Sequence, residues 1–182
     1  MDVDAIPPEK LPLLLTLHPL NLWRYQVAKQ ADKVLLTFLL RHQYSQELKK
    51  AVYDFYEPRT IHDSSLSASI HSIVANDIGY KEEALGYFLQ AARMDLDDYN
   101  RNTHQGIHAA CMGATWMAVV NGFAGMRVYG GKLHFAPLLP PQWEGLEFRI
   151  KFQGWVVKVA VSQKQVVYEL LQGEVLEINH GE

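Results

Sequence analysis

Lys29 and Gln30 are neighbouring polar residues in a segment whose apolar residues recur at helical spacing. On a helix with about 100° per residue, each falls within roughly 20–40° of apolar residues. These apolar residues are Leu22, Leu36 and Leu40 for Lys29, and Trp23 and Val34 for Gln30. In one interpretation the lysine reaches past the apolar face to water and the glutamine satisfies a backbone group. In the other, the pair presents hydrogen-bond donors to a polyhydroxylated ligand.

A second polar group lies in the segment 60–67, which reads Thr-Ile-His-Asp-Ser-Ser-Leu-Ser. Ser64 and Ser65 stand where a helix is expected to begin, so their hydroxyls add donors to the free N–H groups of its first turn. The pair could therefore bind an anion, although a serine before an apolar run also serves simply as an N-cap. A Ser-His-Asp hydrolase is disfavoured, because residues adjacent in sequence cannot readily form the triad and no Gly-x-Ser-x-Gly elbow surrounds them.

His104 and His108 are four residues apart, a spacing that can serve a metal ion. No adjacent glutamate completes a His-Glu-x-x-His pattern, so we expect no metal site. We interpret His108 as a donor beside whatever the 60–67 segment binds, or as a histidine satisfied at a helix start. The sequence has no Gly-x-Gly-x-x-Gly or Walker motif, and no cofactor is expected.

The elements that must position these residues are helices followed by strands. Residues 1–19 contain four prolines and are expected to be extended, after which helical spacing predicts helices at 20–42, 45–53, 64–78, 81–98 and 106–121. Alternating residues and glycine-containing turns then predict antiparallel strands at 126–129, 132–135, 146–152, 155–161, 166–171 and 175–178. We therefore expect a helical domain over 1–125 and a small antiparallel β domain over 126–182.

The composition is that of a packed globular chain of 182 residues, with 48% hydrophobic residues and a net charge of −3. The negative balance argues against a nucleic-acid-binding protein. The charge-free stretch 106–126 is long enough for a membrane span, but it contains His108, Thr115, Asn121 and four glycines, so a helix packed inside protein is favoured. Cys111 is the single cysteine and no secretory signal is recognisable, which favours the cytoplasm.

Taken together, these segments resemble the C-terminal part of family 65 of the glycoside hydrolases, which contains maltose, kojibiose and trehalose phosphorylases. The resemblance covers nearly the whole chain and rests on several motifs in the same order. The motifs lie at His18-Pro19-Leu20, 27–32, Tyr56-Glu57-Pro58, 62–67, 96–99, 106–108, 115–118, 121–123, 133–137 and 139–140.

The resemblance implies helices of an α/α (six-hairpin) barrel followed by a β-sandwich. It implies that phosphate cleaves an α-glucosyl disaccharide with inversion, giving β-glucose 1-phosphate and glucose. In this scheme Lys29 and Gln30 contact the transferred glucose, while Ser64 and Ser65 bind phosphate with His108 as a further contact. Inorganic phosphate is then a co-substrate and no cofactor takes part.

The same resemblance places the catalytic acid, a glutamate, in a segment that would precede Met1. We therefore expect no catalytic acid in this chain and no turnover by it alone. The expected helices are too few to close a barrel, so an upstream chain that completes it, or self-association, is expected. Two alternatives remain: a non-catalytic carbohydrate-binding or structural module, and a fragment of a related inverting α-glucoside hydrolase, which would need a carboxylate in place of the serine pair.

Overall fold

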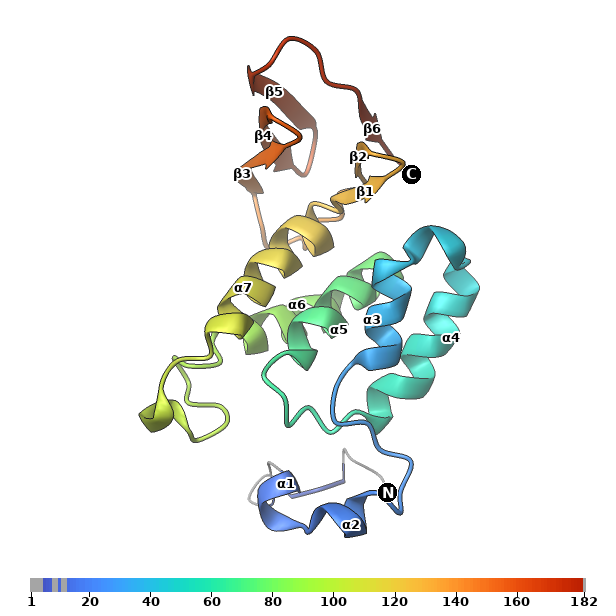
Figure 1. Ribbon diagram of the computed structural model, residues 1–182, viewed down its shortest axis with the longest axis vertical. Coiled ribbons are helices and arrows are strands. Elements are labelled where there is room, and N and C mark those ends of the chain that lie inside the picture. Colours follow the sequence, from blue (N-terminus) through green and yellow to red (C-terminus); the bar gives the residue numbers. More distant parts are fainter. Residues whose placement is uncertain (1–4, 8–9, 11–12, 182) are drawn as a thin grey trace. The chain divides into compact units, whose positions relative to one another are not determined.

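The computed structural model describes residues 5–7, 10 and 13–181 of the chain. The chain divides into two compact units, Met1–Ala118 and Val119–Glu182, whose helices and strands are labelled in Figure 1. The first unit is helical and the second holds the strands, so the predicted order of helices followed by a small β domain is confirmed. The expected boundary after residue 125 lies further along the chain, directly before the first strand.

The first unit is built around α5 (Ser67–Asp77), a helix with almost all of its residues buried. Most of its own residues are small or apolar on all sides, which explains why neighbouring helices can enclose it. Its neighbours are α3 (Asp32–Leu39), α4 (Gln46–Tyr56), α6 (Lys81–Ala92) and α7 (Ala109–Met117). The shorter elements are α1 (Leu13–Thr16), α2 (Pro19–Leu22) and the 3-10 turns Arg41–Gln43, Glu57–Arg59 and Thr103–Gln105.

The prediction of one continuous helix over 20–42 is wrong. Residues 23–31 form turns and a bridge between α2 and α3, and Trp23 and Tyr25 are exposed in these turns. The backbone of Ala28 pairs with Thr60 in a parallel β-bridge instead of continuing a helix. Hydrogen bonds to a distant segment therefore override the local helical spacing.

Two of the predicted helix ends depend on identifiable residues. Ser45 caps α4, with its Oγ accepting a hydrogen bond from the backbone N–H of Leu48 at 3.3 Å. α5 begins at Ser67, slightly later than the 64–65 start that we expected. Gly79 follows the end of this helix with a φ of +87°, a conformation that glycine adopts without the penalty of a side chain.

The last two helices are shorter than expected. α6 ends at Ala92 rather than at 98, and α7 begins at Ala109 rather than at 106. Gly106 has a φ of +121°, which lies outside the helical region. After α7 the chain continues in π-helical turns, Ala118–Phe123. Among the residues that the structure describes, no helix is long and apolar enough to cross a membrane.

The second unit contains two three-stranded sheets. One is formed by β1 (Arg127–Tyr129), β2 (Lys132–Phe135) and β6 (Ile178–His180), and the other by β3 (Gly145–Phe152), β4 (Trp155–Ser162) and β5 (Val166–Gln172). The pairing is antiparallel as expected, except that β6 pairs parallel to β2. A parallel pair needs a long crossover connection, which the second sheet provides here.

The core of this unit lies where residues of both sheets meet. Phe135 of β2 is fully buried, and its ring centroid lies 6.4 Å from that of Phe148 and 5.2 Å from that of Tyr168. Burying these rings offsets the marginal stability of so small a sheet.

Candidate functional site

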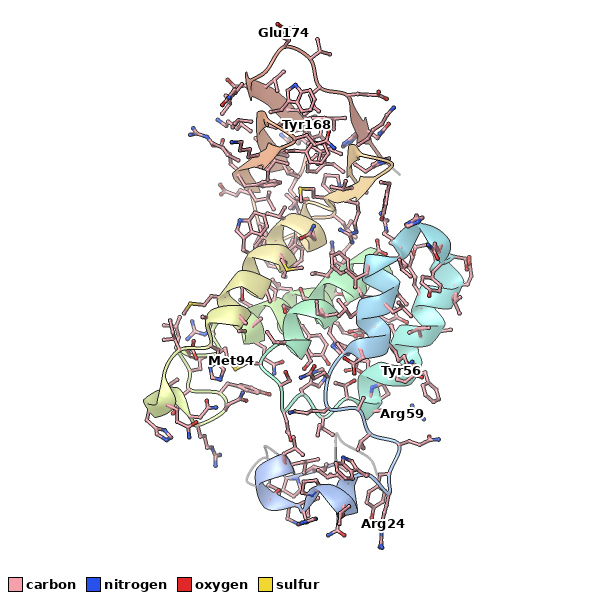
Figure 2. All side chains as sticks on the ribbon, viewed as in Figure 1. Arg24, Tyr56, Arg59, Met94, Tyr168 and Glu174 are labelled. Carbon is pink, nitrogen blue, oxygen red and sulfur yellow. The ribbon has the colours of Figure 1, made fainter. Side chains whose placement is uncertain are left out.

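A parallel β-bridge joins the Lys29–Gln30 pair to residues 60–67, which we call the serine segment. The N–H of Ala28 donates to the carbonyl oxygen of Arg59 at 2.8 Å. The carbonyl oxygen of Ala28 accepts from the N–H of Ile61 at 2.9 Å. Arg59 is labelled near the C-terminal end of α4 in Figure 2. The bridge places two polar segments side by side that are far apart in the sequence.

Lys29 and Gln30 lie in the turn after this bridge and both are exposed. They are therefore not on an apolar helix face, and the geometric reason for selecting them from the sequence was wrong. Gln30 nevertheless lines a pocket of about 190 Å³ together with Leu66 and Ser67 of the serine segment. The structure thus brings one residue of the expected glucose pair directly beside the expected phosphate-binding segment.

Side chains of the serine segment fix it to the surrounding fold. The two carboxylate oxygens of Asp63 accept hydrogen bonds from the backbone N–H groups of Leu13 at 3.0 Å and Leu14 at 2.8 Å. The Thr60 hydroxyl donates to the carbonyl oxygen of Tyr56 at 2.8 Å. Asp63 accepts from free N–H donors at the start of α1. Both oxygens of this carboxylate are therefore used in stabilising the fold.

His62, which is part of the serine segment, connects this segment to α6 through its side chain. Its φ is +51°, a left-handed conformation that a non-glycine residue rarely adopts. Its Nδ1 lies 3.0 Å from the Ser67 hydroxyl, and its Nε2 lies 3.2 Å from the Tyr87 hydroxyl. The Tyr87 hydroxyl in turn donates to a carboxylate oxygen of Glu57 at 2.5 Å.

A second histidine, His71 on α5, lies in the same buried cluster. Its ring centroid is 4.7 Å from that of His62, and its Nδ1 donates to the Ser67 carbonyl oxygen at 2.9 Å. Burial lowers the pKa of His62 to about 3, with a smaller contribution from His71. Burial also lowers the pKa of His71 to about 4, against the opposing effect of its bond to Ser67. Both imidazoles are therefore neutral at pH 7.

Ser64 and Ser65 are half-buried and lie directly before α5. The Ser64 hydroxyl accepts a hydrogen bond from the N–H of Leu66 at 3.4 Å. Among the described residues, none forms a hydrogen bond with the Ser65 side chain. The two hydroxyl protons are therefore available at a helix start, where free N–H groups and the helix dipole favour an anion.

His108 precedes α7 and is held by Asp95. Its Nδ1 lies 2.5 Å from one carboxylate oxygen of Asp95, and its backbone N–H donates to the other at 2.9 Å. The side-chain bond to His108 is the main reason that the pKa of Asp95 lies below its usual value. Since Asp95 accepts a hydrogen bond from Nδ1–H of His108, Nε2 is the ring atom that can face a ligand. His108 does not line the pocket that Gln30 shares with Ser67.

His104 is exposed in the turn Thr103–Gln105, and it does not join His108 in a ligand set. Across residues 5–7, 10 and 13–181, no three His, Cys, Asp or Glu side chains are grouped as a metal ion would require.

Sequence analysis did not select His71 or Tyr87, and it named Glu57 only as part of the Tyr56-Glu57-Pro58 motif, without a role; these three residues complete the cluster around the serine segment. One signal was present, because His71 falls within the otherwise small and apolar pattern of the 64–78 segment. A histidine enclosed in this way must be neutral and hydrogen-bonded, and is therefore tied to its neighbours. Tyr87 carries no comparable signal, and the motif around Glu57 does not predict its contact with Tyr87, because that contact depends on the packing of distant segments.

Comparison with known proteins gives two adjoining family matches. The family model described as "Glycosyl hydrolase family 65 central catalytic domain" matches residues 1–117, and "Glycosyl hydrolase family 65, C-terminal domain" matches residues 126–182. A solved structure assigned as a kojibiose phosphorylase from the human microbiome superposes with a TM-score of 0.92 at 37% identity, covering 100% of this chain and 24% of that one.

Two curated relatives match over almost the same span. An α,α-trehalose phosphorylase of Thermoanaerobacter brockii is 53% identical over 176 residues, or 97% of this chain and 23% of that protein. A maltose phosphorylase of Bacillus subtilis (strain 168) is 38% identical over 177 residues, with the same two coverages. The chain thus spans about a quarter of the length of the relatives that it matches.

Proposed function

Because the chain belongs to glycosyl hydrolase family 65, we propose that it provides glucose-binding and phosphate-binding residues of an inverting disaccharide phosphorylase. In this proposal Lys29 and Gln30 bind the glucose unit that is transferred. Ser64 and Ser65 bind inorganic phosphate, and His108 is a further phosphate contact. The substrates are an α-glucosyl disaccharide and phosphate, with no other cofactor.

The observation that supports this proposal most strongly is the bridge between Ala28 and Thr60. Phosphate must attack the sugar, so the two binding segments have to be neighbours for the reaction to occur. The bridge makes them neighbours through backbone hydrogen bonds, and the pocket shared by Gln30 and Ser67 lies between them.

The chemistry fits hydroxyl donors at this position. In an inverting cleavage an acid protonates the leaving oxygen while a nucleophile attacks the opposite face of the sugar. Phosphate is already an anion and needs no general base, whereas water would need a carboxylate to activate it. Ser64 and Ser65 therefore favour phosphorolysis over hydrolysis. We assign the general acid, a glutamate in the family, to a segment outside these 182 residues.

The identity values suggest which disaccharide to test first. The trehalose phosphorylase of Thermoanaerobacter brockii is 53% identical to this chain, whereas the maltose phosphorylase of Bacillus subtilis is 38% identical. Trehalose is accordingly the substrate that we assign to the complete enzyme.

A chimeric enzyme tests the proposal. This chain would replace the matching 23% of the Thermoanaerobacter brockii trehalose phosphorylase. We expect the chimera to release β-glucose 1-phosphate from trehalose and phosphate, and the chain alone to release none. Replacing Ser64 and Ser65 by alanine in the chimera should lower kcat/KM for phosphate at least about a hundredfold, because two hydrogen bonds to a charged group are lost.

Ser45→Ala provides the control, since Ser45 caps α4 and has no place in the proposed site. Full activity of the chimera without the serine pair would contradict the phosphate assignment. A folded chimera that binds trehalose without cleaving it would instead support a non-catalytic carbohydrate-binding module.

A further inference from the structure

Four side chains form a continuous series of hydrogen bonds that ends at the backbone of the serine pair, Ser64 and Ser65. Glu57 accepts from the Tyr87 hydroxyl at 2.5 Å, and the Tyr87 oxygen lies 3.2 Å from Nε2 of His62. Nδ1 of His62 lies 3.0 Å from the Ser67 hydroxyl, which also lies 3.1 Å from the carbonyl oxygen of Ser64. We call this series of hydrogen bonds the Glu57–Ser67 relay.

The donors and acceptors of the relay have one consistent direction. Tyr87 has a single hydroxyl proton and donates it to Glu57, so its oxygen must accept from Nε2–H of His62. A neutral imidazole then carries no proton on Nδ1, which accepts from the Ser67 hydroxyl. That hydroxyl proton is shared between His62 and the Ser64 carbonyl in a three-centre bond, so the relay ends on the backbone of the serine pair.

The relay is anchored at both ends of the serine pair. His62 lies before the pair in a left-handed conformation, which the surrounding contacts must maintain. Ser67 lies after the pair, and Nδ1 of His71 donates to its carbonyl oxygen. Ser67 is only 1% exposed, so its hydroxyl cannot act as a nucleophile toward a ligand in the pocket.

We propose that Tyr87 and Glu57 are positioning residues, which set the conformation of Ser64 and Ser65 through His62 and Ser67 without touching substrate. The phosphate part of this inference rests on the proposed function. The conformational part does not, because it concerns only the backbone of the serine pair. Removing the Tyr87 hydroxyl leaves Nε2–H of His62 without its acceptor and frees the segment to change conformation.

NMR spectroscopy of the isotope-labelled 182-residue chain tests the inference with Tyr87→Phe. We expect the amide resonances of Ser64 and Ser65 to shift, and the imidazole nitrogen resonances of His62 to report a changed tautomer. Titration with inorganic phosphate should show an affinity about ten- to a hundredfold weaker than that of the wild-type chain, since a small misplacement of binding groups has effects of this size.

Two matched variants control for the loss of a tyrosine hydroxyl. Tyr53 is buried in the same cluster and its hydroxyl donates to Glu83 at 3.1 Å, whereas the Tyr80 hydroxyl donates to Asp54 at 2.9 Å. Tyr53→Phe and Tyr80→Phe should leave the Ser64 and Ser65 resonances and the phosphate affinity unchanged, even where they lower the melting temperature.

Glu57 provides an independent variant pair. Glu57→Gln keeps an oxygen that accepts from Tyr87 and should preserve the wild-type resonances, whereas Glu57→Ala should reproduce the effect of Tyr87→Phe.

The inference is overturned if Tyr87→Phe and Glu57→Ala leave the serine resonances unchanged, or if Tyr53→Phe moves them equally. A wild-type chain that binds no phosphate would refute the proposed function, and the resonances of Ser64 and Ser65 would still decide the role of the relay.

Discussion

His62 and His71 are buried histidines that the fold keeps uncharged beside the serine pair. Burial lowers their pKa values to about 3 and about 4, from an ordinary value of 6.5. The unfolded chain therefore binds protons at a higher pH than the folded chain does. The stability that these neutral side chains provide is complete above pH 6.5 and is lost as the pH falls toward 4.

We expect the free energy of unfolding to fall by up to about 1.4 kcal/mol per pH unit for each of these histidines across this window. Urea denaturation at a series of pH values measures the slope. His104→Gln should leave the slope unchanged because His104 is exposed, whereas His71→Gln should reduce it. A free energy of unfolding that does not change with pH in this window would contradict the buried, neutral state of the cluster.

The candidate binding residues could be named from the sequence, but their surroundings could not. Ser64 and Ser65 were recognisable because two consecutive hydroxyls precede a helical pattern, and this depends only on local residues. The helix-face argument for Lys29 and Gln30 fails because residues 23–31 form turns and a bridge, so their assignment depends on the motif alone. The contacts of His62 with Tyr87 and of Tyr87 with Glu57 join segments whose relation cannot be derived from local spacing.

At the scale of elements, strands were more predictable than helices. Alternation of residues and glycine-containing turns are local signals, so the first five strands lie within one residue of their expected ends. The segment 20–42 failed because its apolar residues recur at helical spacing while its backbone forms turns and bonds to the serine segment. Long-range pairing of this kind, like the parallel pairing of β6 with β2, cannot be predicted from a periodic pattern of residues in the sequence.

Asp77 at the end of α5 connects this helix to α4 through a buried ion pair. Its Oδ2 lies 3.1 Å from Nζ of Lys49, which is 4% exposed, and its Oδ1 lies 2.6 Å from Nε of Arg41. Asp77→Ala removes the carboxylate that pairs with the buried ammonium of Lys49 and should lower the free energy of unfolding by about 3–5 kcal/mol in a denaturant titration.

The exposed pair of Arg93 with Asp97 provides the control for this change, since its atoms approach just as closely, to 2.6 Å. Asp97→Ala should have little effect, because water screens an exposed pair. Equal losses from Asp77→Ala and Asp97→Ala would show that burial of Lys49 does not govern the interaction.

At the scale of the whole molecule, large apolar side chains of the helical unit are exposed to water. Trp23 is 74% exposed, Leu96 78% and Ile107 67%. The relatives are about four times as long as this chain, so the complete family fold contains further structure that could cover such residues. A chain that exposes them has a tendency to associate.

We expect the purified chain to self-associate in a concentration-dependent way, measured by light scattering and sedimentation. Leu96→Ser and Ile107→Ser should reduce association without lowering the melting temperature, since neither side chain is buried in the chain itself. A monodisperse monomer at all concentrations would contradict this expectation.

The most direct test of the central claim, that the serine pair binds phosphate, is an NMR titration of the chain with inorganic phosphate. Each serine hydroxyl contributes a hydrogen bond to a charged group worth about 1.5–3 kcal/mol, so the double variant Ser64→Ala, Ser65→Ala should bind at least about a hundredfold more weakly. Lys29→Ala should retain phosphate affinity, because Lys29 is assigned to the sugar. We predict saturable shifts of the Ser64 and Ser65 amide resonances in the wild-type chain, and an unchanged phosphate affinity in the double serine variant would contradict the account.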